Sequence, residues 1–72
     1  MPKTRTAEEL ISAIPPVAGE MRAACRCRSC SRIFGRRCIP FGLGAGTFYN
    51  LCSCQITNPR TAGYDVLIKI QD

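Results

Sequence analysis

The chain has 72 residues, a hydrophobic share of 46% and a formal net charge of +5 at pH 7. The hydrophobic share excludes a disordered polymer, and the length allows one domain, residues 1–72. A domain of this size buries too little apolar surface to be comfortably stable alone, so the six cysteines are expected to be disulfides or metal ligands. Because the chain has no histidine, it lacks the usual general base, and we expect neither enzymatic activity nor a small-molecule substrate.

The start of the chain bears on its compartment. Residues 1–5 are charged and lack the apolar region of a secretory signal. No stretch approaches the roughly 20 apolar residues that a membrane span needs. We therefore expect a cytoplasmic protein without a membrane span, in which thiols stay reduced and cysteine clusters usually bind metal. If the chain is a processed fragment, this expectation lapses.

The first predicted element is a helix over residues 6–14. Thr6 is a suitable N-cap, and Glu9 three residues later completes a capping box. Four apolar residues follow at helical spacing: Ala7, Leu10, Ile11 and Ile14. The two prolines after this stripe end the helix, and we expect its apolar side to cover a small core. Residues 17–24 are predicted to form a second short helix.

The middle of the chain is expected to be irregular. Residues 25–38 are rich in cysteine and arginine with little periodicity, which predicts knuckles and turns. Residues 39–46 contain three glycines and are expected to form a turned loop. A phosphate-binding loop is not favoured there, because no Lys-Ser or Lys-Thr pair follows and no βαβ unit fits.

Two strands are predicted near the C-terminus, over residues 47–56 and 64–70. Both alternate in hydropathy, and residues 57–63 between them have the composition of a long hairpin loop. The sequence thus predicts a small α+β, cysteine-stapled fold. A helical segment, 1–24, precedes a cysteine-rich segment, 25–72, that consists of a knuckle and a C-terminal β-hairpin.

The first group of cysteines contains a recognisable pattern. Residues 27–34, CRSCSRIF, resemble the zinc knuckle of zinc-ribbon and treble-clef proteins, in which a C-x-x-C turn is followed by a basic and then an aromatic residue. Two residues between the cysteines let a tight turn aim both sulfurs at one ion, with Zn–S near 2.3 Å. Phe34 is expected to pack beneath the site.

A second pair of ligands must come from elsewhere in the chain. Two cysteines separated by one residue on a strand point to the same side, so the C-x-C at 52–54 can face the knuckle. Zinc ribbons usually carry a second C-x-x-C instead. The predicted ligands of one Zn²⁺ site are Cys27, Cys30, Cys52 and Cys54. Cys25 and Cys38 are alternates, and cysteines left over are expected to be buried small hydrophobes.

Disulfides are the competing interpretation. Close-spaced cysteines do not easily bridge one another, so the triplet within 25–30 would pair with the three later cysteines. The product would be a secreted cationic peptide without a cofactor, similar to defensins and thionins in its C-x-C pair and arginine-rich loops. An iron–sulfur cluster is less favoured, because the spacing fits neither ferredoxin pattern.

Arginines concentrate around the first cysteines. Residues 22–37 contain six arginines and no acidic residue, and arginine binds phosphate bidentately and stacks on bases. The predicted nucleic-acid contacts are Arg26, Arg28, Arg32, Arg36, Arg37 and Phe34. Alternatively, these arginines only keep a cysteine-rich loop soluble.

The sequence therefore predicts a non-catalytic, basic zinc-binding module. Its partner is expected to be nucleic acid or the acidic surface of an assembly partner, held mainly by electrostatics. Two other interpretations stay open: the secreted three-disulfide peptide, and a small structural subunit whose N-terminal helix and C-terminal strand dock on neighbours in a larger complex.

Overall fold

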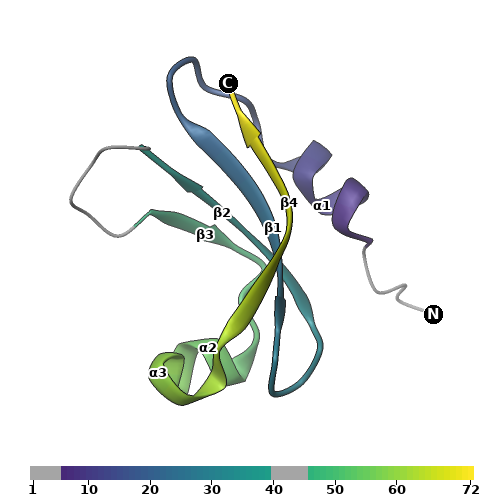
Figure 1. The fold of residues 1–72 in the computed structure, drawn as a ribbon, viewed down its shortest axis with the longest axis vertical. Helices are drawn as coiled ribbons and strands as arrows, with labels where there is room; N and C mark the ends of the chain where they lie inside the picture. The colour runs from purple at the N-terminus through teal and green to yellow at the C-terminus, as the bar shows by residue number, and fades with distance from the viewer. Residues whose placement is uncertain (1–5, 40–45) are drawn as a thin grey trace.

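The computed structural model describes residues 6–39 and 46–72. Its frame is a four-stranded antiparallel sheet with the strand order β3-β2-β1-β4 (Figure 1). The elements in chain order are α1 (Ala7–Ala13), β1 (Met21–Cys27), β2 (Ile33–Cys38), β3 (Thr47–Tyr49), α2 (Ser53–Thr57), α3 (Pro59–Ala62) and β4 (Tyr64–Gln71). The two short helices α2 and α3 lie at the same end of the sheet as the β1–β2 turn (Figure 1). A small α+β fold is thus observed.

The predicted N-terminal helix is confirmed as α1. The hydroxyl of Thr6 accepts a hydrogen bond from the amide of Glu9 at 3.2 Å and donates to its carboxylate at 3.1 Å. The apolar stripe packs on one side of the sheet, where Ile14 is fully buried. A Cβ built on Gly35 of β2 would lie 2.5 Å from Ile14 Cδ1. The helix approaches the sheet this closely because residue 35 has no side chain.

The helix predicted for 17–24 and the irregular knuckle predicted for 25–38 are both wrong in their main-chain structure. These residues contain β1 and β2, which pair as an antiparallel hairpin. Gly19 has a φ of 85° and turns the chain ahead of β1. The buried residues of β1, at positions 23, 24, 25 and 27, are alanine and cysteine. They show no alternation of apolar and polar residues, and alanine favours helix in isolation.

The predicted C-terminal β-hairpin is also wrong. The strand over 64–70 is confirmed as β4, but it pairs with β1, and the strand predicted for 47–56 ends at Tyr49 in β3, which pairs with β2. Asn50 has a φ of 59° and interrupts the extended chain. The segment expected to be the hairpin loop contains α3 and part of α2. The turned loop expected over 39–46 lies mostly outside the described residues.

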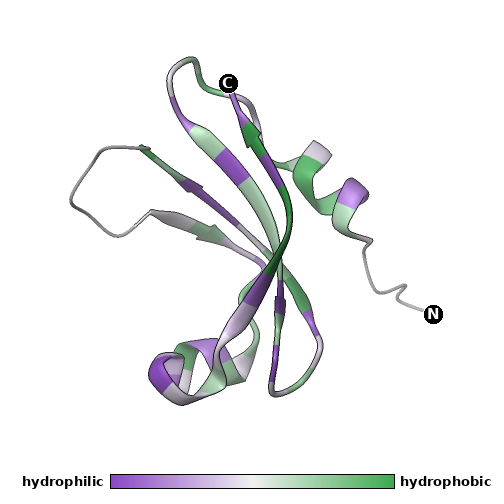
Figure 2. Cartoon of the chain, viewed as in Figure 1, coloured by the Kyte–Doolittle hydropathy of each residue, from purple (hydrophilic) through white to green (hydrophobic). Residues whose placement is uncertain are grey.

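The strand register divides the side chains between two sides of the sheet. Ala24 lies opposite Gly35 and Ile68, and this side carries α1. The other side is the open face, a row that crosses all four strands and consists of Phe48, Arg36, Ala23 and Lys69. β4 is hydrophobic through its middle (Figure 2), and its pairing with β1 shifts register between Ala24 and Cys25.

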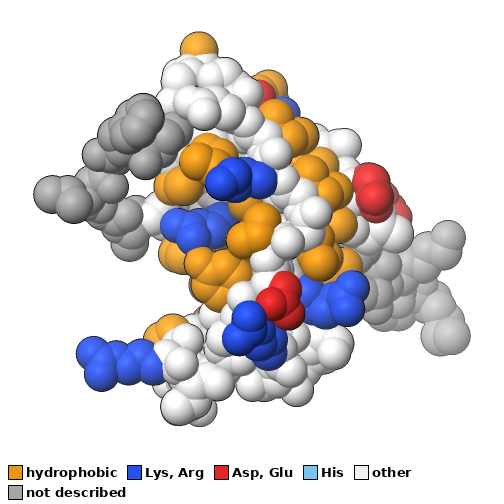
Figure 3. All heavy atoms as spheres, viewed as in Figure 1, with side chains coloured by type: hydrophobic (Ala, Val, Ile, Leu, Met, Phe, Trp, Pro, Cys, Tyr) orange, Lys and Arg blue, Asp and Glu red, His pale blue; other side chains and the backbone are white. Residues whose placement is uncertain are grey.

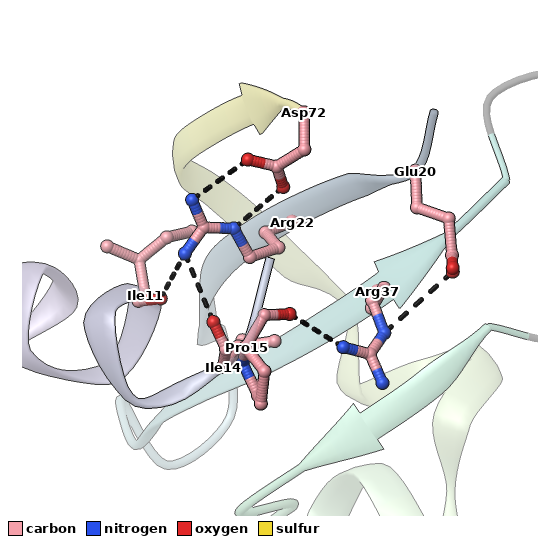
Figure 4. A network of polar contacts seen from close by, with 7 residues as sticks. All are labelled: Ile11, Ile14, Pro15, Glu20, Arg22, Arg37 and Asp72. Carbon is pink, nitrogen blue, oxygen red and sulfur yellow. Dashed lines mark hydrogen bonds and ion pairs between the residues drawn. The ribbon is translucent and has the colours of Figure 1, made fainter. Parts of the chain in front are cut away.

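An arginine clamps α1 to the sheet. The guanidinium of Arg22 donates to the carbonyl oxygens of Ile11 and Ile14 at 3.0 and 3.1 Å, and makes a bidentate pair with Asp72 at 2.8 and 3.1 Å (Figure 4). These carbonyls belong to the end of α1, where helical partners run out. The arginine therefore satisfies the helix terminus and ties it to the C-terminal residue beyond β4.

Candidate metal centre

Four cysteines from two distant segments meet at one end of the sheet. The Sγ atoms of Cys27, Cys30, Cys52 and Cys54 all lie within 4.8 Å of one another. Four sulfurs at tetrahedral corners around zinc would be about 3.8 Å apart for Zn–S bonds near 2.3 Å. The set could therefore hold a metal ion after a contraction of the sulfurs of roughly 1 Å or less. Two of the thiols are buried, Cys54 is half-buried and Cys30 is exposed.

The first pair is positioned by the β1–β2 turn. Cys27 ends β1, its amide donates to the carbonyl of Arg32 at 2.9 Å, and its carbonyl accepts from the amide of Ser31 at 2.8 Å. Ser31 has a φ of 66°, in the left-handed region that reverses the chain. The turn folds Cys30 back over Cys27, so the tight turn predicted from the C-x-x-C spacing is present at the hairpin tip, in a form compatible with a zinc knuckle.

The second pair comes from a helix start and not from a strand. Cys52 is the N-cap residue of α2 in extended conformation, and Cys54 lies in the first turn of that helix. The prediction that this pair lies near the knuckle holds, but its reason, a shared strand face, is wrong. The change from extended to helical backbone between the two cysteines brings both sulfurs to the same end of α2.

Hydrogen bonds prepare one sulfur to act as a thiolate. Burial raises the pKa of the Cys27 thiol, but donors from the amides of Cys30 and Ser29 and from the Gln55 side chain outweigh it and lower the pKa to about 6. The Gln55 amide lies 3.6 Å from Cys27 Sγ and also donates to the carbonyl of Gly63 at 2.7 Å. Since thiolate is the form that binds metal, Cys27 is the best prepared ligand of the set.

Gln55 was not among the residues predicted for the site. It lies directly after Cys54 and three residues after Cys52, a spacing that places side chains on neighbouring positions of a helix. That signal requires α2 to be recognised as a helix. If these residues formed a strand, the Gln55 side chain would point to the side opposite Cys54.

A small apolar core lies beneath the four sulfurs. Phe34 is fully buried and packs with Cys25, Cys27 and Cys52, while its ring meets that of Tyr64 edge-on at a centroid distance of 5.5 Å. The prediction that Phe34 packs under the site is confirmed. Its predicted contact with nucleic acid is wrong, because a ring with no exposed area cannot stack on a base.

The two alternate ligands lie outside the metal cluster. Cys25 is fully buried in the core, where burial raises the pKa of its thiol, and Cys38 is half-buried at the end of β2. All six cysteines are free thiols. The structure therefore contains none of the disulfides that a secreted three-disulfide peptide requires, and the spare Cys25 serves as a small hydrophobe.

The predicted arginine contacts are not gathered on one surface. Arg36 and Arg37 are neighbours in β2, so their side chains point to opposite sides of the sheet. Arg37 lies on the α1 side, where it donates to the carbonyl of Pro15 at 2.7 Å and pairs with Glu20 at 3.8 Å (Figure 4). This arginine is a structural residue.

The remaining predicted arginines surround the knuckle. Arg28 donates to Asp65 at 2.8 and 3.0 Å, and this guanidinium holds the pKa of the carboxyl below its usual range. Arg32 donates to the side-chain oxygen of Asn50 at 2.9 Å. Arg26 is exposed on β1. All three point to water at the end of the molecule that holds the sulfurs.

None of the described helices has both the length and the apolar character needed to cross a membrane. No protein family model, no curated protein and no solved structure matches this chain.

Proposed function

We propose that this chain is a non-catalytic structural zinc module that binds the phosphate groups of nucleic acid. The observation that carries the proposal is the gathering of four cysteine Sγ atoms within 4.8 Å. A tetrahedral all-sulfur site suits zinc, and four thiolates close its coordination sphere and leave no position for a substrate. The ion would act as a staple between the β1–β2 turn and α2.

The segment that carries the second cysteine pair has little else to hold it. α2 has no buried residue and α3 has only Ala62. Ile56, the largest apolar side chain of α2, is 67% exposed. Packing of this kind stabilises a segment weakly, whereas metal binding in a small domain contributes directly to folding free energy. Zinc would thus supply the stability that apolar burial does not.

The charge distribution favours an anionic partner. Three of the five acidic residues are occupied in ion pairs with arginine, namely Glu20, Asp65 and Asp72. The exposed cations Arg26, Arg32, Arg60 and Lys69 form no ion pair in the described part of the chain. Unpaired surface cations attract phosphates and release counterions on binding.

Metal content tests the staple. Chain purified without chelators is expected to contain one zinc ion by elemental analysis and by native mass spectrometry, and to lose its dispersed amide NMR spectrum when zinc is removed. Cys27→Ser should abolish both zinc content and folding, because a ligand is lost. Cys38→Ser is the matched control and should retain one zinc ion. A folded chain without metal, or one with the absorption of an iron–sulfur cluster, would contradict the proposal.

Binding tests the partner. Zinc-loaded chain should bind labelled oligonucleotides in fluorescence anisotropy, with an affinity that falls steeply and linearly on a logarithmic salt axis. Replacing an unpaired surface cation by glutamine should reduce the slope of that line by roughly 0.7 to 0.9 for each phosphate contact that is lost. The absence of binding to any nucleic acid at low salt would refute this part of the proposal and leave an acidic protein as the partner to test.

A further inference from the structure

The open face of the sheet carries charge and an aromatic ring that the knuckle does not need. Cross-strand pairing places Phe48 opposite Arg36, Arg36 opposite Ala23, and Ala23 opposite Lys69. Directly opposed residues share one side of a sheet. A single row therefore runs across all four strands. Phe48 and Arg36 lie on one side of the small Ala23 side chain, and Lys69 lies on the other.

The cation in the middle of the row is held by aromatic groups and not by an acid. The Arg36 guanidinium carbon lies 5.6 Å from the centroid of the Phe48 ring, and its NH1 group donates to the Tyr64 hydroxyl at 2.7 Å. Its Nε atom is buried without a hydrogen-bond partner. The charge is therefore fixed in position, and no acidic residue in the described part of the chain forms an ion pair with it.

The described residues that flank the row on this side are mostly apolar, and none of them is acidic. The same-side neighbours at the flanking register positions are Met21, Cys38, Gln71, Cys25, Phe34 and Val66. Phe48 is 40% exposed and Val66 is 51% exposed. Basic side chains set among hydrophobic ones are seen over the strands in Figure 3. Cys25 and Phe34 are fully buried beneath this face, and its exposed part complements a ligand with both flat apolar groups and negative charges.

We infer that the open face binds a single strand of nucleic acid, with a base stacked on Phe48 and phosphates at Arg36 and Lys69. This inference rests on the proposed function, because it specifies the kind of nucleic acid and the surface that receives it. An unpaired base can present its flat side to an exposed ring, whereas the bases of a duplex are stacked on one another. The phosphate backbone supplies the negative charge that the two cations lack.

Affinity for single and double strands is the first test. The probe is a fluorescein-labelled oligothymidylate of about 12 nucleotides, and the comparison is the same strand annealed to its complement, both with the zinc-loaded chain. The single strand is expected to bind more tightly at every salt concentration. Equal or tighter binding of the duplex would overturn the inference while leaving the proposed function intact. Binding of neither probe at low salt would count against the nucleic-acid part of the proposed function as well as against this inference.

Substitution of the ring is the second test. Phe48→Ala should weaken single-strand binding by roughly 5- to 150-fold, as expected for loss of one stacked base, without changing the salt slope. Phe48→Tyr keeps a ring and should retain the affinity. Ile56→Ala removes an apolar side chain of α2 that is more exposed than Phe48, 67% against 40%, and is the control for loss of exposed apolar surface. An unchanged affinity in Phe48→Ala would overturn the inference.

Substitution of the lysine is the third test. Lys69→Gln should lower the salt slope for single strands by about 0.7, the value for one phosphate contact.

An NMR titration of the unmodified chain locates the contact without depending on how a variant folds. Amide shifts of the unmodified, zinc-loaded chain during titration with the oligothymidylate should be largest in β1, β2, β3 and β4 at the residues of the row. Shifts confined to the β1–β2 turn and α2 would show that the knuckle is the contact, and would overturn the inference even if Phe48→Ala failed to fold.

Discussion

The close contact between α1 and β2 permits a sharp test of packing. In Gly35→Ala the new Cβ would lie 2.5 Å from Ile14 Cδ1, while the next nearest atoms, Ala23 O and Ile14 Cγ1, are both at the ordinary contact distance of 3.5 Å. Ile14 is fully buried, so the conflict can be relieved only by a shift of the isoleucine side chain within the core. The entire conflict therefore comes from one methyl group.

The expected magnitude follows from two opposing terms. Overpacking in a filled core costs about 1–3 kcal/mol, and replacing glycine in an extended segment recovers about 0.4–1 kcal/mol of unfolded-chain entropy. Gly35→Ala should therefore lower the free energy of unfolding by roughly 1–2 kcal/mol. Ile14→Val alone should cost about 0.5–1.5 kcal/mol. In the double variant the clash is removed, and the alanine should add no cost to that of the valine.

Urea denaturation of the zinc-loaded chain, followed by circular dichroism, measures this coupling. Gly19→Ala is the matched control, because Gly19 has a φ of 85° and a Cβ there would meet no atom within 4 Å. Its cost, about 1 kcal/mol from the left-handed backbone, should be the same with isoleucine or valine at position 14. If Gly35→Ala costs the same in both backgrounds, the contact described between α1 and β2 is wrong.

Three further substitutions test polar contacts. Gln55→Ala should weaken zinc binding by roughly 10- to 100-fold in competition with a colorimetric chelator, because its amide donates to a ligand sulfur, while Gln71→Ala should have no effect. Tyr64→Phe removes the hydroxyl that accepts from a half-buried guanidinium, and should cost about 1.5–3 kcal/mol in urea denaturation; a smaller loss would mean that water replaces the hydroxyl. Asp72→Ala leaves a largely buried arginine without its carboxylate and should cost about 3 kcal/mol, whereas Asp65→Ala breaks an exposed pair and should leave the urea midpoint nearly unchanged. The pKa of Asp65 is lowered in the fold. Any stabilisation from its pair with arginine is therefore present above the pKa of a free carboxyl and is lost as the pH falls through the lowered value. A stability difference between the unmodified chain and Asp65→Ala that grew in acid would contradict this sign.

Local patterns predicted those parts of the fold that depend on local interactions. The capping box and apolar stripe specify α1 within one turn of its ends, and the alternation over residues 64–70 specifies β4. The C-x-x-C spacing predicts a turn with two convergent sulfurs, which the β1–β2 tip provides. Each of these features is decided by residues a few positions apart.

The pairing of strands could not be predicted in this way. β1 is extended because it pairs with β2 on one side and with β4 on the other. Its alanines and cysteines do not favour a strand by themselves. Treating residues 25–38 as turns also concealed the alternation that separates Arg36 from Arg37. The arginines that are clustered in the sequence therefore lie around the β1–β2 turn, on the open face and on the α1 side, where they hold the fold together.

The position of Cys38 has a practical consequence. It is half-buried and lies outside the sulfur cluster, whereas Cys25 is sealed in the core. With zinc shielding the four clustered thiols, a maleimide dye would attach at one position, and the same reagent would reach every cysteine once the ion and the fold are lost. The number of dyes attached per chain then reports site occupancy directly, in cell extract as well as in purified material, without any change to the sequence.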